Sequence, residues 1–214
     1  MGIEHDIFIS YAHVDNEALA EGQKGWITLL EERLRKRLRQ LLGEDVEIWR
    51  DPKLQGNDIF SDELVIKLGK SRLLLSVLSP RYLNSEWCQK ELHAFCQLTT
   101  VNGSLTIDNK SRIFKVVKTY LSRDKHPQLL KGLLGYEFYE FDESNGKAKE
   151  FSPDIDPKKD QRYWDKLEEL AWDIKQLLEA IRGSQSAPTP SSGHTEVPLV
   201  YPKPLSTSLK PPRI

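Results

Sequence analysis

Apolar positions along the first 182 residues change repeatedly between two spacings, and each change marks the border of an expected element. Four short runs rich in β-branched, aliphatic and aromatic residues predict strands buried in a sheet, at residues 6–11, 46–51, 73–78 and 112–117. Residues 136–141 alternate apolar and polar side chains with period two, which predicts an edge strand with one face in water.

Between these runs the spacing becomes helical. A first helix is indicated by apolar residues at intervals of three or four, namely Trp26, Leu30, Leu34, Leu38 and Leu41. Gly43 supplies its stop signal. Basic residues between positions 33 and 39 cover the remaining face, which predicts a solvated surface, with a phosphate site as the alternative. Residues 63–68 predict a short helix, and an apolar stripe after the Asp156-Pro157 cap predicts a long helix that ends at Gly183.

Strands that alternate with helices up to about residue 182 predict an α/β fold, in which helices cover both faces of a parallel sheet. Residues 183–214 differ, because they are rich in Ser, Thr and Pro and carry too little apolar surface to fold alone. We therefore expect one domain over residues 1–182 and a disordered linker or tail over residues 183–214. A polyproline recognition motif is the alternative for the tail.

Charge and cysteine content narrow the range of partners. The 31 basic and 32 acidic residues give a formal net charge of −1, so no overall field directs the chain to nucleic acid or to an anionic membrane. Cys88 and Cys96 lie roughly 12 Å apart on one expected helix, too far for a disulfide. No segment resembles a signal peptide or a membrane helix. The sequence predicts a soluble, cytoplasmic protein.

The most informative residue is Glu91, on the helix expected after the third strand. A helix that begins at residue 84 or 85 places Trp87, Glu91 and Phe95 along one face at i, i+4 spacing. The carboxylate then lies between two aromatic side chains at the mouth of an open α/β sheet, where such folds bind ligands. The alternative is a glutamate at the helix edge that only borders a core face.

Four segments follow one another along the chain. They are Asp-Ile-Phe-Ile-Ser-Tyr from residue 6, Trp-Arg-Asp from residue 49 with Leu-Gln-Gly-Asn from residue 54, Leu-Ser-Pro-Arg-Tyr-Leu-Asn-Ser from residue 78 and Trp-Cys-Gln-Lys-Glu-Leu from residue 87. Together they resemble the motifs of a Toll/interleukin-1 receptor (TIR) domain of the bacterial type. The resemblance covers roughly residues 4–182. It implies a flavodoxin-like fold whose five-stranded parallel sheet has the order 2-1-3-4-5.

The resemblance also implies an activity. Catalytically active TIR domains cleave NAD⁺ between nicotinamide and ribose, and their essential glutamate follows a tryptophan by four residues, as Glu91 follows Trp87. Glu91 is then the catalytic residue and Trp87 a wall of the pocket. One carboxylate suits this reaction, because nicotinamide leaves a cationic ring as a neutral base and needs no proton from a second acid. Glu91 would bind the ribose hydroxyls and stabilise the oxocarbenium-like charge.

Further substrate contacts are expected near the end of the first strand. Ser10, Tyr11 and His13 lie at or just beyond this end, where an open sheet presents ligand contacts. A half-buried structural tyrosine and an exposed loop histidine are the alternatives for Tyr11 and His13.

The segment after the second strand resembles the BB loop of the family, which closes over the site and takes part in contacts between domains. The resemblance implies that Leu54 and Phe60 pack over the substrate, with Asp51 at the strand end. The other histidines form no cluster at metal-ligand spacing, so we expect no metal, and no cofactor besides NAD⁺ itself as substrate. No glycine-rich phosphate loop follows the first strand, which argues against a Rossmann redox enzyme or a P-loop NTPase.

The leading hypothesis is an NAD⁺ glycohydrolase of a bacterial defence system, which releases nicotinamide and either ADP-ribose or a cyclic isomer. The resemblance implies activation by self-association, so the expected partners are NAD⁺, other TIR domains and a sensor domain or protein beyond the linker. The alternatives are a non-catalytic TIR adaptor and an effector that subverts host TIR signalling. Many receptor TIR domains carry a Phe-Trp pair near the last helix, which this chain lacks in that form. Its absence weakens the adaptor hypothesis more than the enzyme hypothesis.

Overall fold

A five-stranded parallel sheet forms the centre of the computed structural model, which describes residues 3–50, 62–153 and 160–186. Its order is β2-β1-β3-β6-β7. The strands are β1 (His5–Tyr11), β2 (Ile48–Arg50), β3 (Ser71–Leu78), β6 (Ile113–Val117) and β7 (Gly135–Glu137). Counted within this sheet the order is 2-1-3-4-5, and each neighbouring pair is parallel. The predicted flavodoxin-like α/β fold is confirmed.

The central strands are buried on both faces, as their continuous apolar runs predict. In β1 every residue from Asp6 to Tyr11 is buried. Because successive side chains of a strand point to opposite faces, Ser10 and Tyr11 serve different layers of the fold. The register of β1 and β3 places Ser10 beside Ser76.

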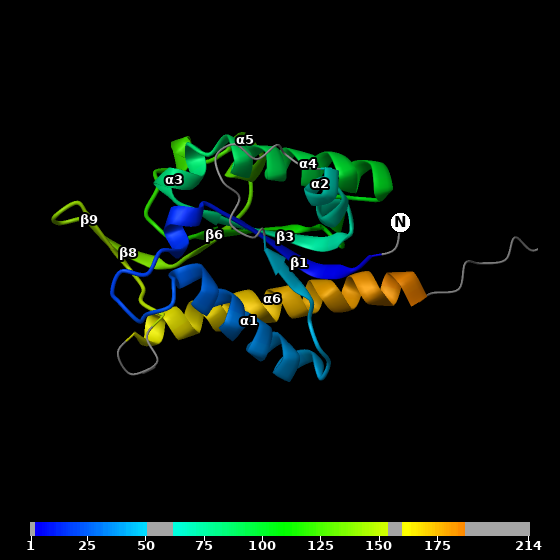
Figure 1. Cartoon of the computed structure of the whole chain (residues 1–214), viewed down its shortest axis with the longest axis horizontal. Helices are drawn as coiled ribbons and strands as arrows, with labels where there is room; N and C mark the ends of the chain where they lie inside the picture. The colour runs from blue at the N-terminus through cyan, green and yellow to red at the C-terminus, as the bar shows by residue number, and fades with distance from the viewer. Residues whose placement is uncertain (1–2, 51–61, 154–159, 187–214) are drawn as a thin grey trace, which may run out of the picture.

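One face of the sheet is covered by α1 (Trp26–Leu42) and α6 (Gln161–Ser186), which lie below it in Figure 1. We call this the α1/α6 layer. Its core joins aliphatic residues of both helices, such as Leu34 and Ile174, to the strand residues that face them. The stop of α1 is as predicted, because Gly43 adopts a left-handed conformation with φ 75° and its N–H bonds to the Arg39 carbonyl.

In the part of the chain that the structure describes, the opposite face is covered by helices that lie above the sheet in Figure 1: α2 (Asp62–Gly69), α3 (Pro80–Leu83), α4 (Glu86–Asn102) and α5 (Gln128–Lys131). We call this the α4 layer, after its longest helix. Phe8 and Leu74 of the sheet pack here against Leu92 and Phe95 of α4. The two layers bury their apolar surface on opposite sides of the same strands.

Several segments differ from the sequence prediction. The helix α4 reaches Asn102, and the chain then forms a hairpin of β4 (Thr106–Ile107) and β5 (Lys110–Ser111), where the sequence pattern predicted neither strand. The last helix continues beyond Gly183 to Ser186. The Asp156-Pro157 cap lies outside the described residues.

The predicted edge strand at residues 136–141 is divided in two. The parallel strand β7 ends at Glu137, and β8 (Tyr139–Asp142) pairs instead with β9 (Lys147–Glu150). Phe138 separates them, because its ring is fully buried and packs edge-on against Trp26 in the α1/α6 layer. The resulting hairpin projects from the body of the domain (Figure 1).

The order of strands also fixes where ligands are expected. From β1 the chain moves outward to β2 on one side, whereas β3 lies on the other side of β1. Open α/β sheets bind ligands at the carboxyl ends of the strands, at such a reversal of direction. Here that edge is formed by the 3₁₀ helix η1 (His13–Asn16) after β1 and by the start of α3 after β3.

Candidate functional site

Glu91 lies inside the α4 layer. The helix that carries it begins after Ser85, whose hydroxyl accepts a hydrogen bond from the Cys88 backbone N–H at 3.3 Å. The i, i+4 spacing then turns Glu91 and Phe95 toward the sheet, where their exposed fractions are 2% and 0%. Glu91 is therefore a buried carboxylate rather than a residue at the helix edge.

Ser10 of β1 meets this carboxylate. Its hydroxyl donates a hydrogen bond of 2.5 Å to Glu91 Oε2, between two side chains that are both buried. A hydrogen bond to an ionised acceptor is shorter and stronger than one between neutral groups. This bond joins the carboxyl end of β1 to the middle of α4, as expected from the position of both residues at the ligand edge.

Tyr82 of α3 completes the buried polar group, although the sequence analysis did not select it. Its phenol oxygen lies 3.4 Å from Ser10 Oγ and 3.5 Å from the Cys88 carbonyl oxygen, and the residue is fully buried. Burial raises the pKa of Tyr82 well above its ordinary value, and the charge of Glu91 adds to this effect. The available signal was the position of Tyr82 three residues after Ser79, which caps α3.

Cys88 is unsuited to nucleophilic chemistry in this surrounding. Burial, with a smaller contribution from the Glu91 carboxylate, raises the pKa of the Cys88 thiol to about 12. The thiolate is the reactive form of cysteine, so Cys88 is an inert buried thiol. Both Cys88 and Cys96 are free, in agreement with the predicted absence of a disulfide between them.

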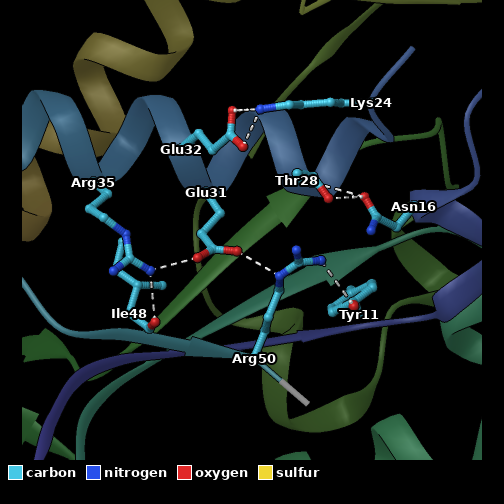
Figure 2. Close-up of polar contacts among 9 residues, drawn as sticks. All are labelled: Tyr11, Asn16, Lys24, Thr28, Glu31, Glu32, Arg35, Ile48 and Arg50. Atoms are coloured by element: carbon cyan, nitrogen blue, oxygen red, sulfur yellow. Dashed lines mark hydrogen bonds and ion pairs between the residues drawn. The ribbon is translucent and has the colours of Figure 1, made fainter. Parts of the chain in front are cut away.

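Tyr11 lies on the other side of the sheet from Glu91, and His13 contacts Tyr11. Tyr11 packs into the core of the α1/α6 layer, and its ring makes an edge contact with His13 at a centroid distance of 5.3 Å. Arg50 Nη1, at the end of β2, lies 3.4 Å from the Tyr11 hydroxyl (Figure 2). Of the three residues predicted at the end of β1, Ser10 hydrogen-bonds Glu91 directly.

Figure 2 shows how Arg50 is held. Glu31 of α1 bridges the guanidinium groups of Arg35 and Arg50, each at 2.6 Å, and Arg35 also donates to the Ile48 carbonyl at 2.9 Å. Two cations share one carboxylate, so this cluster carries a net positive charge beside Tyr11. The whole cluster leaves no local signal in the sequence, because Arg50 lies on β2 whereas Glu31 and Arg35 lie on α1.

The loop after β1 is tied to both neighbouring helices. Asn16 Oδ1 accepts a hydrogen bond from the Thr28 backbone N–H at 2.8 Å (Figure 2), and Asp15 Oδ2 accepts one from Ser79 Oγ at 2.5 Å. A side chain at Gly25 would lie 1.8 Å from the Asn16 carbonyl oxygen, so only glycine permits this approach. Burial raises the pKa of Asp15, and the hydrogen bond from Ser79 opposes that rise.

Four further residues were predicted to contact the substrate. Trp87 is half-buried and packs against the core of the α4 layer. Asp51, Leu54 and Phe60 lie outside the described residues.

Two general features concern the described residues as a whole. No three His, Cys, Asp or Glu side chains in residues 3–50, 62–153 and 160–186 gather as metal ligands would. None of the helices in the same ranges is long and apolar enough to span a membrane.

A separate open groove of about 610 Å³ runs between α1 and α6, far from Glu91 in the fold, and is lined by charged side chains such as Lys36 and Glu168.

Sequence comparison assigns the family. The family model for the TIR domain matches residues 7–147, which include β1, the Glu91 helix and most of the parallel sheet. The chain belongs to the TIR domain family. A comparison with curated proteins returns no match.

Solved TIR domains resemble the chain at low sequence identity. The TIR domain of the Toll-related receptor TRR-2 from Hydra magnipapillata is 14% identical, with a TM-score of 0.45, and the match covers 80% of this chain and 99% of that one. The TIR domains of the activated Roq1 resistosome, which recognises the pathogen effector XopQ, are 16% identical with a TM-score of 0.38, over 85% and 99% of the two chains. The TIR family match ends within β9, so α6 lies beyond it.

Proposed function

We propose that this TIR domain cleaves NAD⁺ between nicotinamide and ribose, with Glu91 as the catalytic carboxylate. The observation that carries the proposal is a carboxylate with 2% exposure, hydrogen-bonded by Ser10 at the ligand edge of the sheet. The surrounding layer is otherwise packed with apolar side chains such as Leu92 and Phe95. An apolar residue at position 91 would complete this layer without the cost of removing a charge from water. Retention of a carboxylate there is typical of a site that uses it.

The chemistry requires a single carboxylate. As the glycosidic bond breaks, its electron pair leaves with nicotinamide, and positive charge develops on the ribose ring. Glu91 stabilises that charge and hydrogen-bonds the ribose hydroxyls. Water then adds to the ribose carbon and loses a proton, which gives ADP-ribose, or an adenine nitrogen adds instead and gives a cyclic isomer. NAD⁺ is the substrate, and the reaction needs no further cofactor or metal.

The other proposed substrate residues divide by position. Ser10 orients the carboxylate, and Trp87, four residues before Glu91 on α4, walls the pocket. Tyr11 and His13 contact the substrate beyond the end of β1, next to Arg50. Asp51, Leu54 and Phe60 of the following loop pack over it.

Burial of Glu91 also bears on regulation. A carboxylate with 2% exposure is out of reach of a dissolved substrate, so turnover requires neighbouring residues to move. We propose that self-association with other TIR domains supplies this movement. The segment at 183–214 then acts as a linker toward a sensor domain or protein, in a cytoplasmic bacterial defence system that consumes NAD⁺ on infection.

The same burial supports one alternative, a TIR adaptor that binds other TIR domains without catalysis. In that case Glu91 and Ser10 form a structural hydrogen bond inside the α4 layer. An effector that subverts host TIR signalling would share this structural hydrogen bond between Glu91 and Ser10.

The test is NAD⁺ loss with identification of the products by mass spectrometry. Wild type, Glu91→Ala and Glu86→Ala are compared at high protein concentration with a crowding agent, and again at high dilution. Glu86 is an exposed glutamate in the first turn of the same helix and serves as the matched control. We expect cleavage by wild type and Glu86→Ala in the crowded sample, and none by Glu91→Ala.

Each contrary result has a separate meaning. A folded, assembled wild type that leaves NAD⁺ intact favours the adaptor. Equal rates per molecule in the crowded and diluted samples contradict activation by assembly. The product masses distinguish ADP-ribose from a cyclic isomer.

A further inference from the structure

Three buried hydroxyl groups gather on the sheet face beneath Glu91. Ser10 of β1 and Ser76 of β3 are register partners on neighbouring strands, and Tyr82 of α3 reaches down to them. All three residues have an exposed fraction of 0%. Hydroxyl groups in a buried apolar layer cost free energy unless they are hydrogen-bonded, so their hydrogen bonds determine what they can do.

The protons of this cluster can be assigned. A serine hydroxyl carries one proton and can accept as well as donate. The 2.5 Å contact of Ser10 Oγ with Glu91 Oε2 takes that proton, because a carboxylate oxygen is an acceptor and the contact is the shorter of the two that Ser10 makes. Since that proton is directed at Glu91, Ser10 Oγ can form a hydrogen bond with the Tyr82 phenol, 3.4 Å away, only by accepting from it.

Tyr82 is suited to be that donor. Burial raises its pKa well above the ordinary value, so the phenol keeps its proton across the physiological range. The nearest acceptors among the described contacts are Ser10 Oγ and, at 3.5 Å, the Cys88 carbonyl. These two acceptors compete for the phenol proton at nearly equal distances. A proton given to Ser10 Oγ points toward the carboxylate beyond it.

The tyrosine itself is fixed from the backbone side. Ser79 Oγ accepts a hydrogen bond from the Tyr82 backbone N–H at 3.0 Å, and the same hydroxyl donates to Asp15 at 2.5 Å. Pro80 follows Ser79 at the first position of α3, where its ring restricts the backbone. The backbone of Tyr82 is thus anchored to the β1 loop and the end of β3, the two segments that form the ligand edge.

From this geometry we infer that Tyr82 is a positioning residue of the site. Its hydroxyl donates to Ser10 Oγ and thereby keeps the Ser10 proton directed at Glu91 Oε2, which fixes the orientation of the carboxylate. The inference rests on the proposed function, because it assigns Glu91 as the group whose orientation matters.

The kinetic test compares Tyr82→Phe with Tyr163→Phe. Tyr163 is the matched control, since it is also fully buried but lies in the α1/α6 layer. Under conditions where wild type cleaves NAD⁺, we expect Tyr82→Phe to lower kcat about 10-fold, as loss of an orienting partner does, while KM stays within about twofold of the wild-type value. Tyr163→Phe should leave both constants unchanged. An unchanged kcat in Tyr82→Phe, or an equal loss in both variants, overturns the inference.

A second measurement does not depend on activity. The urea midpoint of unfolding is measured for Tyr82→Phe, Glu91→Gln and the double variant, and the three are repeated in a Ser10→Ala background. We expect Tyr82→Phe to shift the midpoint less when Glu91 is already replaced, and this dependence should vanish without the Ser10 hydroxyl. If the midpoint shifts of Tyr82→Phe and Glu91→Gln are additive while Ser10 is present, the inferred connection of Tyr82 to Glu91 through Ser10 is overturned. If the wild type is inactive but the midpoint shifts are not additive, NAD⁺ cleavage is refuted. The hydrogen-bonded chain from Tyr82 through Ser10 to Glu91 is then a structural feature.

Discussion

The two layers that cover the sheet bury different kinds of side chain. The α1/α6 layer has a core of aliphatic and aromatic residues from two long helices and from the strands that face them, and the ion pair of Arg37 with Glu168 lies at its surface. The α4 layer buries Glu91, Ser10, Ser76 and Tyr82 among its apolar residues. Both layers use the same strands, so the difference comes from the residues that alternate along the strands and from the helices that cover each face.

The α4 layer also contains a buried cation. Lys115 of β6 has an exposed fraction of 5%, and its Nζ donates to the Leu130 carbonyl of α5 at 3.0 Å. Burial lowers the pKa of Lys115. It is the register partner of Ser76, so a row of polar residues crosses β1, β3 and β6 on this face. Under the proposed function, we infer that the α1/α6 layer provides stability and that the α4 layer gives up some stability for chemistry.

Glu91→Gln should have the largest effect on this contrast. The substitution keeps the shape of the side chain and an oxygen that accepts from Ser10, but it removes the charge. We expect NAD⁺ cleavage to fall about 100-fold or more, while the free energy of unfolding changes by no more than about 1 kcal/mol. Steady-state kinetics and urea unfolding measure the two quantities. A wild-type rate in this variant would exclude Glu91 from the mechanism.

The reverse pattern is expected for Ile174→Ala in the other layer. Ile174 of α6 is fully buried in an apolar surrounding. Its truncation should lower the free energy of unfolding by about 2–5 kcal/mol, with no loss of activity per folded molecule below the unfolding temperature. Urea unfolding and kinetics on the same sample measure both. A selective loss of activity would show that the α1/α6 layer shapes the site.

A smaller effect is expected at the glycines that follow a helix in each layer. Gly43 after α1 has φ 75°, whereas Gly132 after α5 has φ −77°, and a Cβ at either position meets nothing within 4 Å. Gly43→Ala should therefore destabilise by about 1 kcal/mol through backbone strain alone. Gly132→Ala should be neutral or slightly stabilising. Thermal unfolding of the two variants checks this, and equal destabilisation would contradict the backbone explanation.

The smallest expected effect concerns pH. Burial raises the pKa of Asp15 above its ordinary value of 3.8, which means that the folded state binds a proton more readily than the unfolded chain. Stability contributed by Asp15 should therefore increase as pH falls through the folded pKa toward 3.8, and should be lost as pH rises. Asp15→Asn removes this dependence. Unfolding midpoints of both proteins between neutral pH and pH about 4 measure the difference. A contribution of Asp15 to stability that decreases as the pH is lowered would contradict this expectation.

Much of the fold could be predicted from local patterns. Period and turn residues located the five parallel strands, the stop of α1 at Gly43 and the helix that carries Glu91. The division at Phe138 could not be predicted, because an alternating run looks the same whether it pairs with one strand or changes partner. The four-residue helix α3 is too short to leave a periodic signal.

The candidate site was predicted in part. Spacing on α4 turned Glu91 and Phe95 to one side, and proximity to the strand end selected Ser10. Tyr11 was grouped with Ser10 by position, although the alternation of a strand sends it to the opposite layer. Tyr82 was missed because its contact with Ser10 spans 72 positions of sequence, and no local pattern reports such a contact.

The central claim is that the polar group beneath α4 is kept for chemistry and not for stability. Its most direct test is the urea midpoint of a triple variant, Glu91→Leu with Ser10→Ala and Tyr82→Phe, which replaces the linked polar groups together so that none of the three leaves another unsatisfied. The account predicts a midpoint equal to or above that of wild type, in a protein that no longer cleaves NAD⁺. A loss of about 3 kcal/mol or more in the free energy of unfolding would show that the polar group stabilises the layer, and would contradict the account.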